Sequence, residues 1–176
     1  DGVNYKGPQM IYNRYGTTVV KDCTVSVEKN GASASAQELA EANRLIFSGK
    51  TSVAVSTSSN AAVWFPFSGA AFTVEENAEL TISAPSTYVF YTDGAAKPIF
   101  GFGKNSKTYF YTKSGLFYAS GTGAHIASSV TVEDGALLYA TATANNGVPL
   151  LKCSGALSVG QGASLFLNLP TRGSSP

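Results

Sequence analysis

The chain has 176 residues, which is enough for one domain with a continuous core. Only 13% of the residues are charged, and 12 Lys and Arg nearly balance 11 Asp and Glu, for a formal net charge of +1. With no basic surplus and no apolar run of about 18 residues, the composition argues against nucleic-acid binding and membrane insertion and favours a soluble extracellular β-protein.

Short β-rich stretches separated by turn residues occupy the first 70 residues, with one exception. The stretches expected to be strands are residues 10–12, 17–27, 45–47, 52–55 and 63–67. The exception is residues 33–44, which are rich in Ala and Glu, and this composition favours a short helix packed outside the strands or over one end.

A phrase of nine residues recurs three times and predicts the architecture. The copies are residues 72–80 (FTVEENAEL), 130–138 (VTVEDGALL) and 157–165 (LSVGQGASL). In each copy a strand-ending Val is followed after three residues by Asn77, Gly135 or Gly162, residue types that accept a left-handed backbone. The copies start 58 and 27 residues apart, close to two periods and one. A strand, a tight corner and a strand repeated at this spacing indicate a parallel β-helix, or β-solenoid.

The central third is unusually aromatic, with short runs at residues 88–91, 100–102, 109–111 and 116–118. Side chains alternate across a strand, so we expect Val89 with Tyr91, and Phe110, to face inward. The aromatic rings are open to two interpretations: stacks within the core, or an exposed stripe on one flat sheet face suited to sugar rings. The candidate ligand-binding residues of such a stripe are Tyr88, Tyr91, Tyr109, Tyr111 and Tyr118.

The two cysteines and the single histidine do not predict a redox or metal centre. Cys23 and Cys153 are 130 positions apart, which in a solenoid places them several turns apart, so we expect two buried free thiols. A disulfide would require the ends to fold back on each other. His125 has no Cys or carboxylate at ligand spacing, and we expect an ordinary surface or hydrogen-bonded histidine, no metal site and no cofactor.

The acidic residues do not form a catalytic pattern. Glu75 and Glu76 occupy the same place in the first copy of the phrase as Glu133 and Asp134 in the second, so stacked corners could gather carboxylates around a cation. The third copy has no acid there, which favours solvated turn acids. No nucleophile elbow, phosphate loop or zinc-protease motif is present, and we expect no catalysis.

Four segments together are similar to a known family. They are residues 5–12 (YKGPQMIY), 17–25 (TTVVKDCTV), 41–53 (EANRLIFSGKTSV) and 72–80 (FTVEENAEL). In this order, over roughly residues 3–140, the chain resembles the pectate-lyase-like adhesive domain of Gram-positive surface proteins, found in secreted or wall-attached proteins of lactobacilli and enterococci. The resemblance implies a right-handed parallel β-helix without lyase activity, displayed on the cell surface for adhesion. It supplies no site residues, and the wall-binding Trp-x-Leu signature of some such proteins is missing at Trp64, the single tryptophan.

We therefore expect one solenoid domain over residues 1–170 and a flexible tail over 171–176, excised from a larger exported protein because no signal peptide opens the chain. The expected function is non-catalytic attachment of a monomer to host or bacterial surface glycans or proteins, outside the cell or on its wall. Three alternatives stay open: a structural spacer or stalk, a polysaccharide lyase or hydrolase on the same fold, and a phage-tail or autotransporter passenger solenoid, which shares the fold and differs in source.

Overall fold

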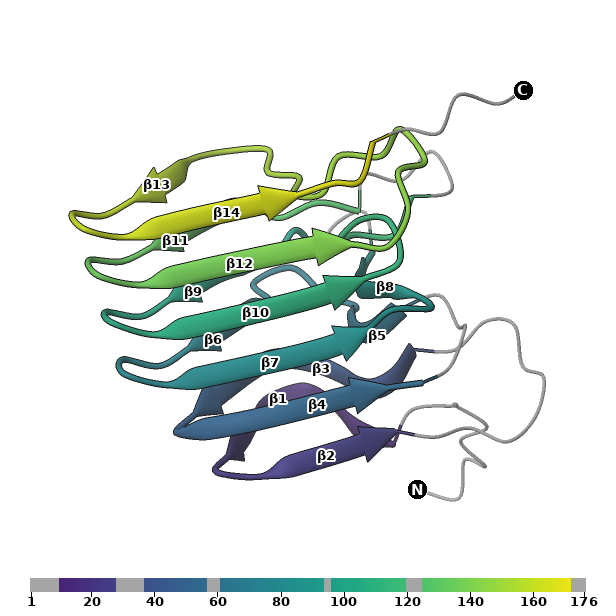
Figure 1. The fold of residues 1–176 in the computed structure, drawn as a ribbon. Coiled ribbons are helices and arrows are strands. Elements are labelled where there is room, and N and C mark those ends of the chain that lie inside the picture. The colour runs from purple at the N-terminus through teal and green to yellow at the C-terminus, as the bar shows by residue number, and fades with distance from the viewer. Residues whose placement is uncertain (1–9, 28–36, 57–60, 94–95, 120–124, 172–176) are drawn as a thin grey trace, which may run out of the picture.

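The computed structural model describes residues 10–27, 37–56, 61–93, 96–119 and 125–171, and this part of the chain contains fourteen β-strands and no helix. The strands pair in parallel and stack as a β-solenoid of about five turns (Figure 1). The fold class predicted from the repeated phrase is confirmed.

One side of the solenoid is a six-stranded parallel sheet, which faces the viewer in Figure 1. Its strands are, in spatial order, β2 (Thr24–Val27), β4 (Lys50–Val55), β7 (Glu79–Ala84), β10 (Lys107–Thr112), β12 (Leu137–Ala142) and β14 (Ser164–Asn168). The spatial order follows the chain order, because each turn of the solenoid contributes one strand and lies directly on the turn before it.

The remaining strands form an eight-stranded sheet that bends. They are β1 (Ile11–Lys21), β3 (Gln37–Ser48), β5 (Ala61–Phe65), β6 (Ala71–Val74), β8 (Tyr88–Thr92), β9 (Ile99–Phe102), β11 (Ser129–Val132) and β13 (Leu157–Val159). The first half of β3 pairs with β5, with Glu41 opposite Trp64, and its second half pairs with β6, with Phe47 opposite Val74. The bent sheet therefore supplies two sides of the solenoid, and the six-stranded sheet supplies the third.

A left-handed residue forms the corner between the bent sheet and the six-stranded sheet in every turn. The corner residues have φ between 47° and 67° and lie 27 to 30 residues apart: Asp22, Gly49, Asn77, Asn105, Gly135 and Gly162. The corners predicted at Asn77, Gly135 and Gly162 are confirmed, and three more belong to the same series. The side chain of Asn105 donates to that of Asn77 in the neighbouring turn, at 3.4 Å.

The core lies between the sheets and is dominated by phenylalanine. Side chains alternate along the strands, so that β7 and β12 each bury every second residue. Phe72 lies at the centre, with its ring centroid 5.1 to 6.1 Å from those of Phe47, Phe90, Phe100, Phe102 and Phe110. Burying each such side chain stabilises the fold by about 1.5–3 kcal/mol.

The predicted helix over residues 33–44 is wrong where the structure describes it, because β3 begins at Gln37. Ala and Glu favour a helix in isolation, but this segment lies between two strands that offer parallel pairing on both edges, β1 and β5. Leu39, Ala40 and Ala42 are fully buried there. Tertiary pairing and burial therefore override the local preference.

The structure also tests the expected facing of three strand residues and the expected state of the two cysteines. Val89 and Phe110 face the core as expected, but Tyr91 is half-exposed, because Val89 and Phe90 are both buried and the alternation slips in β8. Cys23 and Cys153 are free thiols as expected, although each is half-exposed and not buried.

Within the described ranges, the search for a helix long and apolar enough to cross a membrane finds none.

The corner geometry predicts that replacing glycine by alanine destabilises the fold at a corner but not within a strand. A Cβ on Gly135 would have to sit at φ 67° and only 2.5 Å from Asn105 Oδ1, whereas a Cβ on Gly101 has no neighbour within 4 Å and no positive φ. We expect Gly135→Ala to lower the free energy of unfolding by about 1–2 kcal/mol in urea titrations, and Gly101→Ala to change it by less than about 0.5 kcal/mol. Equal effects of the two substitutions would contradict the assigned role of the corner.

Candidate functional site

The five tyrosines predicted from the sequence lie on two different sheets and do not form one stripe. Tyr109 and Tyr111 lie on β10 of the six-stranded sheet. Tyr88 and Tyr91 lie on β8 of the bent sheet, and Tyr118 follows Phe117, which bridges to Phe90 of β8. Each group has its own neighbours and is described separately.

The first group continues across three adjacent strands on the outer face of the six-stranded sheet. Tyr109 of β10 is in register with Tyr139 of β12, which is in register with Phe166 of β14. The ring centroid of Tyr139 lies 6.2 Å from those of both Tyr109 and Tyr111. We call Tyr109, Tyr111, Tyr139 and Phe166 the aromatic platform. Parallel strands are about 4.8 Å apart, so the platform extends about 10 Å along the solenoid axis.

The aromatic platform is exposed and bordered by small polar side chains. Tyr111 is 38% exposed and Phe166 is 57% exposed, while Tyr109 and Tyr139 are half-buried. On β7, Thr81 is opposite Tyr109 and Ser83 is opposite Tyr111. A row of aromatic faces beside hydroxyl groups on a flat sheet offers ring stacking together with hydrogen bonds.

The second group is packed largely against itself. The ring centroid of His125 lies 4.4 Å from that of Tyr91 and 5.2 Å from that of Tyr118, and Tyr118 also contacts Tyr88 at 5.5 Å. His125 is 6% exposed, and its Nδ1 lies 2.6 Å from the carbonyl oxygen of Thr92. The expectation of a hydrogen-bonded histidine is confirmed. The tyrosine rings here are occupied by one another, which leaves less ring surface for a ligand than on the aromatic platform.

An ion pair lies beside this second group, next to Trp64, whose ring centroid is 6.1 Å from that of Tyr91. Arg14 Nε lies 2.7 Å from Glu41 Oε1, and Glu41 is 1% exposed. The Arg14 guanidinium also lies over the rings of Trp64 and Phe67, with Cζ 5.4 and 4.8 Å from their centroids. The Glu41 carboxylate is buried and held by its ion pair, so it is not available for proton transfer to a substrate.

Burial also raises the pKa of Asp93 above its ordinary value of 3.8, although Trp64, Arg14 and His125 act in the opposite direction. The pKa of Tyr91 is raised as well, first by burial and then by the negative charge of Asp93. Both shifts are those of groups withdrawn from water beside the stacked rings.

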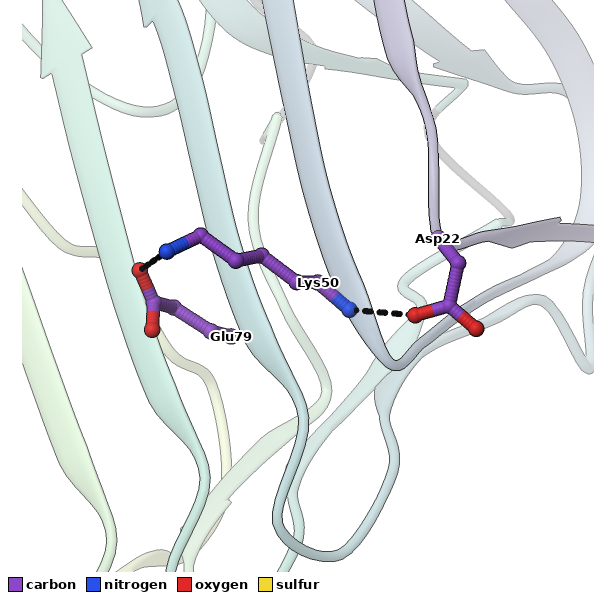
Figure 2. Close-up of polar contacts among 3 residues, drawn as sticks. All are labelled: Asp22, Lys50 and Glu79. Atoms are coloured by element: carbon purple, nitrogen blue, oxygen red, sulfur yellow. Dashed lines mark hydrogen bonds and ion pairs between the residues drawn. The ribbon is translucent and has the colours of Figure 1, made fainter.

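The acids of the repeated corners bind backbone amides of adjacent turns. Figure 2 shows the pattern: Asp22 accepts a hydrogen bond from the backbone N–H of Lys50 at 2.9 Å, and Lys50 Nζ lies 3.3 Å from a Glu79 carboxylate oxygen. In the same way Glu133 accepts from the N–H of Lys104 and Asp134 from that of Gln161. These three carboxylates connect one turn of the solenoid to the next.

Glu75, Glu76 and Glu133 also border one open hollow, together with Gly101 and Gly103. The acids belong to corners separated by the turn that carries Asn105. Within the described ranges, no group of three or more His, Cys, Asp or Glu side chains is placed to hold a metal ion.

The sequence analysis missed two platform residues, Tyr139 and Phe166. A signal for both was available, because Tyr109, Tyr139 and Phe166 each follow the left-handed corner residue of their turn by four positions. Aligning the turns on their corners, instead of searching for aromatic runs, would have placed all three in one row.

Comparison with protein-family models, with curated proteins and with solved structures finds no match for this chain. The function is therefore argued from the sequence and the geometry.

The raised pKa of Asp93 predicts that the free energy of unfolding depends on pH. The folded protein binds the Asp93 proton more tightly than the unfolded chain, so this contribution to stability is present below the ordinary pKa of 3.8 and is lost as pH rises through the higher folded value. We expect Asp93→Asn to remove this loss. The free energy of unfolding of the variant, relative to the unsubstituted protein, should increase in urea titrations as the pH rises from below the ordinary pKa of 3.8 toward neutral pH. A difference that does not change with pH would contradict the prediction.

Proposed function

We propose that the chain is a non-catalytic adhesion domain that attaches an exported bacterial protein to surface glycans. The observation that carries this proposal is the aromatic platform on the outer face of the six-stranded sheet. Sugar rings present C–H faces that pack on aromatic rings, and their hydroxyl groups match the Thr and Ser side chains beside the platform. The resemblance to pectate-lyase-like adhesive domains supports the same function and a place on the cell surface or wall.

The shape of the platform favours weak and multivalent binding. A flat sheet face does not enclose a ligand, so each site contributes little affinity on its own. Display of many copies on a cell surface compensates, because linked sites bind with high effective concentration. A surface with these properties fits attachment better than turnover of a substrate.

The lyase or hydrolase alternative is less well supported by the described residues. Such an enzyme needs carboxylates that are free to hold calcium or to act as acid and base. Glu133 and Asp134 instead accept hydrogen bonds from backbone amides of adjacent turns, and Glu41 is buried against Arg14.

The structural spacer is the second candidate function, and the continuous stacking of turns favours it. Each strand of the six-stranded sheet except the two at the ends has a parallel partner on both edges, which gives a stiff rod. A spacer requires no ligand, whereas an adhesin does.

The proposal predicts a binding defect specific to the platform. The labelled domain, presented as a multimer, should bind a few related glycans on an array of plant, host and bacterial glycans that includes polygalacturonate. Tyr111→Ala and Tyr139→Ala should each weaken monovalent binding about threefold to tenfold, because each removes one stacking ring. The matched control is Tyr15→Ala, which removes a 78% exposed ring from the bent sheet and should leave binding unchanged.

Two results would overturn this assignment. An array without saturable binding would favour the spacer. Loss of binding with Tyr91→Ala but not with Tyr111→Ala would move the site to the tyrosines around His125.

A further inference from the structure

A hollow on the outer face of the six-stranded sheet lies beside the aromatic platform. Its volume is about 510 Å³, and it lies over β2, β4, β7 and the corner before β2. The polar side chains that line it include those of Asp22, Thr24, Lys50, Ser52, Glu79 and Thr81. The hollow therefore brings together three hydroxyl groups, two carboxylates and one ammonium group, all of which exchange hydrogen bonds with a polar ligand.

The hollow and the aromatic platform belong to one row of residues. Thr24 is in register with Ser52, Ser52 with Thr81, and Thr81 with Tyr109, from which the row continues through the platform. Thr24 and Ser52 are exposed and Thr81 is half-buried, so their hydroxyl groups are at the surface. Parallel strands are about 4.8 Å apart, so the row over all six strands of the sheet is about 24 Å long. A single sugar covers only a small part of it.

The charged side chains at the corner side of this row alternate in sign along the solenoid axis. Figure 2 shows three of them: Asp22 accepts a hydrogen bond from the N–H of Lys50, and Lys50 Nζ lies 3.3 Å from the Glu79 carboxylate. Glu79 is in register with Lys107, so the fourth charge is positive again. Two negative and two positive groups give this side of the row no net charge. The carboxylates would repel a polyanion and the ammonium groups a polycation, whereas an uncharged ligand meets neither repulsion.

The repeat distance of the solenoid suits a chain of sugars. An extended sugar chain advances per residue by about the distance between neighbouring turns, which is about 4.8 Å. A chain that runs along the solenoid axis therefore meets one position of the row at each sugar, an aromatic ring over β10, β12 and β14 and a hydroxyl group over β2, β4 and β7. A chain that runs across the axis leaves the row at once.

We propose, on the basis of the proposed function, that the ligand is an uncharged linear polysaccharide that lies along the solenoid axis and occupies both the platform and the hollow. Its rings stack on Tyr109 and Tyr139, and its hydroxyl groups bind Ser52, Thr81 and the charged groups of the hollow. Stacking on an aromatic face tolerates many sugars. The hollow adds donors and acceptors at fixed positions, which select among them.

Titration calorimetry of the 176-residue chain with oligosaccharides of graded length tests the extended site. The probes are neutral series cut from glucan, xylan, mannan and galactan, and oligogalacturonates of the same lengths. We expect at least one neutral series to bind, with the hexasaccharide about tenfold tighter than the disaccharide, because only the longer chain reaches both parts of the row. Oligogalacturonates should bind about threefold or more weakly than that neutral series, because their carboxylates must pass Asp22 and Glu79.

A substitution in the hollow separates its contribution from that of the platform. Ser52→Leu fills part of the hollow and removes a hydroxyl group without adding a charge. It should weaken binding of the hexasaccharide about threefold to tenfold and leave binding of the disaccharide, which stacks on the platform, unchanged. The matched control is Ser129→Leu, the same change on β11 of the bent sheet, which should leave both affinities unchanged.

Failure of this inference differs from failure of the proposed function. An affinity that does not rise with chain length, tighter binding of oligogalacturonates, or a hexasaccharide affinity unaffected by Ser52→Leu would overturn the extended uncharged site. The adhesion proposal would stand in each of these cases if Tyr111→Ala and Tyr139→Ala still weaken binding. Binding of no neutral series would overturn the ligand class, and a glycan array without saturable binding would overturn both proposals.

Discussion

Parallel stacking of turns in register is the constraint on which the rest of this structure depends. A chain that winds into a solenoid must change direction at the same place in every turn, or its strands lose their partners in the turns above and below. The left-handed corner residue achieves this between the bent sheet and the six-stranded sheet, from Asp22 to Gly162. Only Asp, Asn and Gly occupy these corners, the residue types that adopt positive φ at least cost. The repeated phrase is thus a consequence of backbone geometry.

Stacking in register also creates the candidate site. From the corner at Asn77 onward, the position four residues after the corner lies on the outer face in every turn, so residues far apart in sequence form a continuous row. Thr81, Tyr109, Tyr139 and Phe166 form one such row, polar at its start and aromatic toward the last turn. The core rows beneath are filled by residues such as Leu80, Leu138 and Leu165, so the outer surface can vary while the core is retained.

The fold could be predicted from the sequence to the extent that local residues determine it. Corner chemistry identified Asn77, Gly135 and Gly162, and the spacing of the copies gave the parallel architecture. The failure at β3 has a different origin, because its strand conformation depends on neighbours that are remote in sequence. Tyr91 was placed in the core because strict alternation was assumed, and β8 buries Val89 and Phe90 in succession. The division of the five tyrosines between two sheets could not be predicted, because the sequence does not show which side of each turn a strand occupies.

The same one-dimensional stacking determines how the aromatic platform is held in place. Tyr139 on β12 has in-register neighbours in the turns on both sides, Tyr109 on β10 and Phe166 on β14. In a solenoid each turn is stabilised by the turns that it contacts, so the order of each platform residue depends on the strands beside its own. The aromatic platform is therefore a property of three stacked turns together, and a substitution that disturbs the pairing of β10, β12 and β14 weakens it even when no aromatic ring is removed.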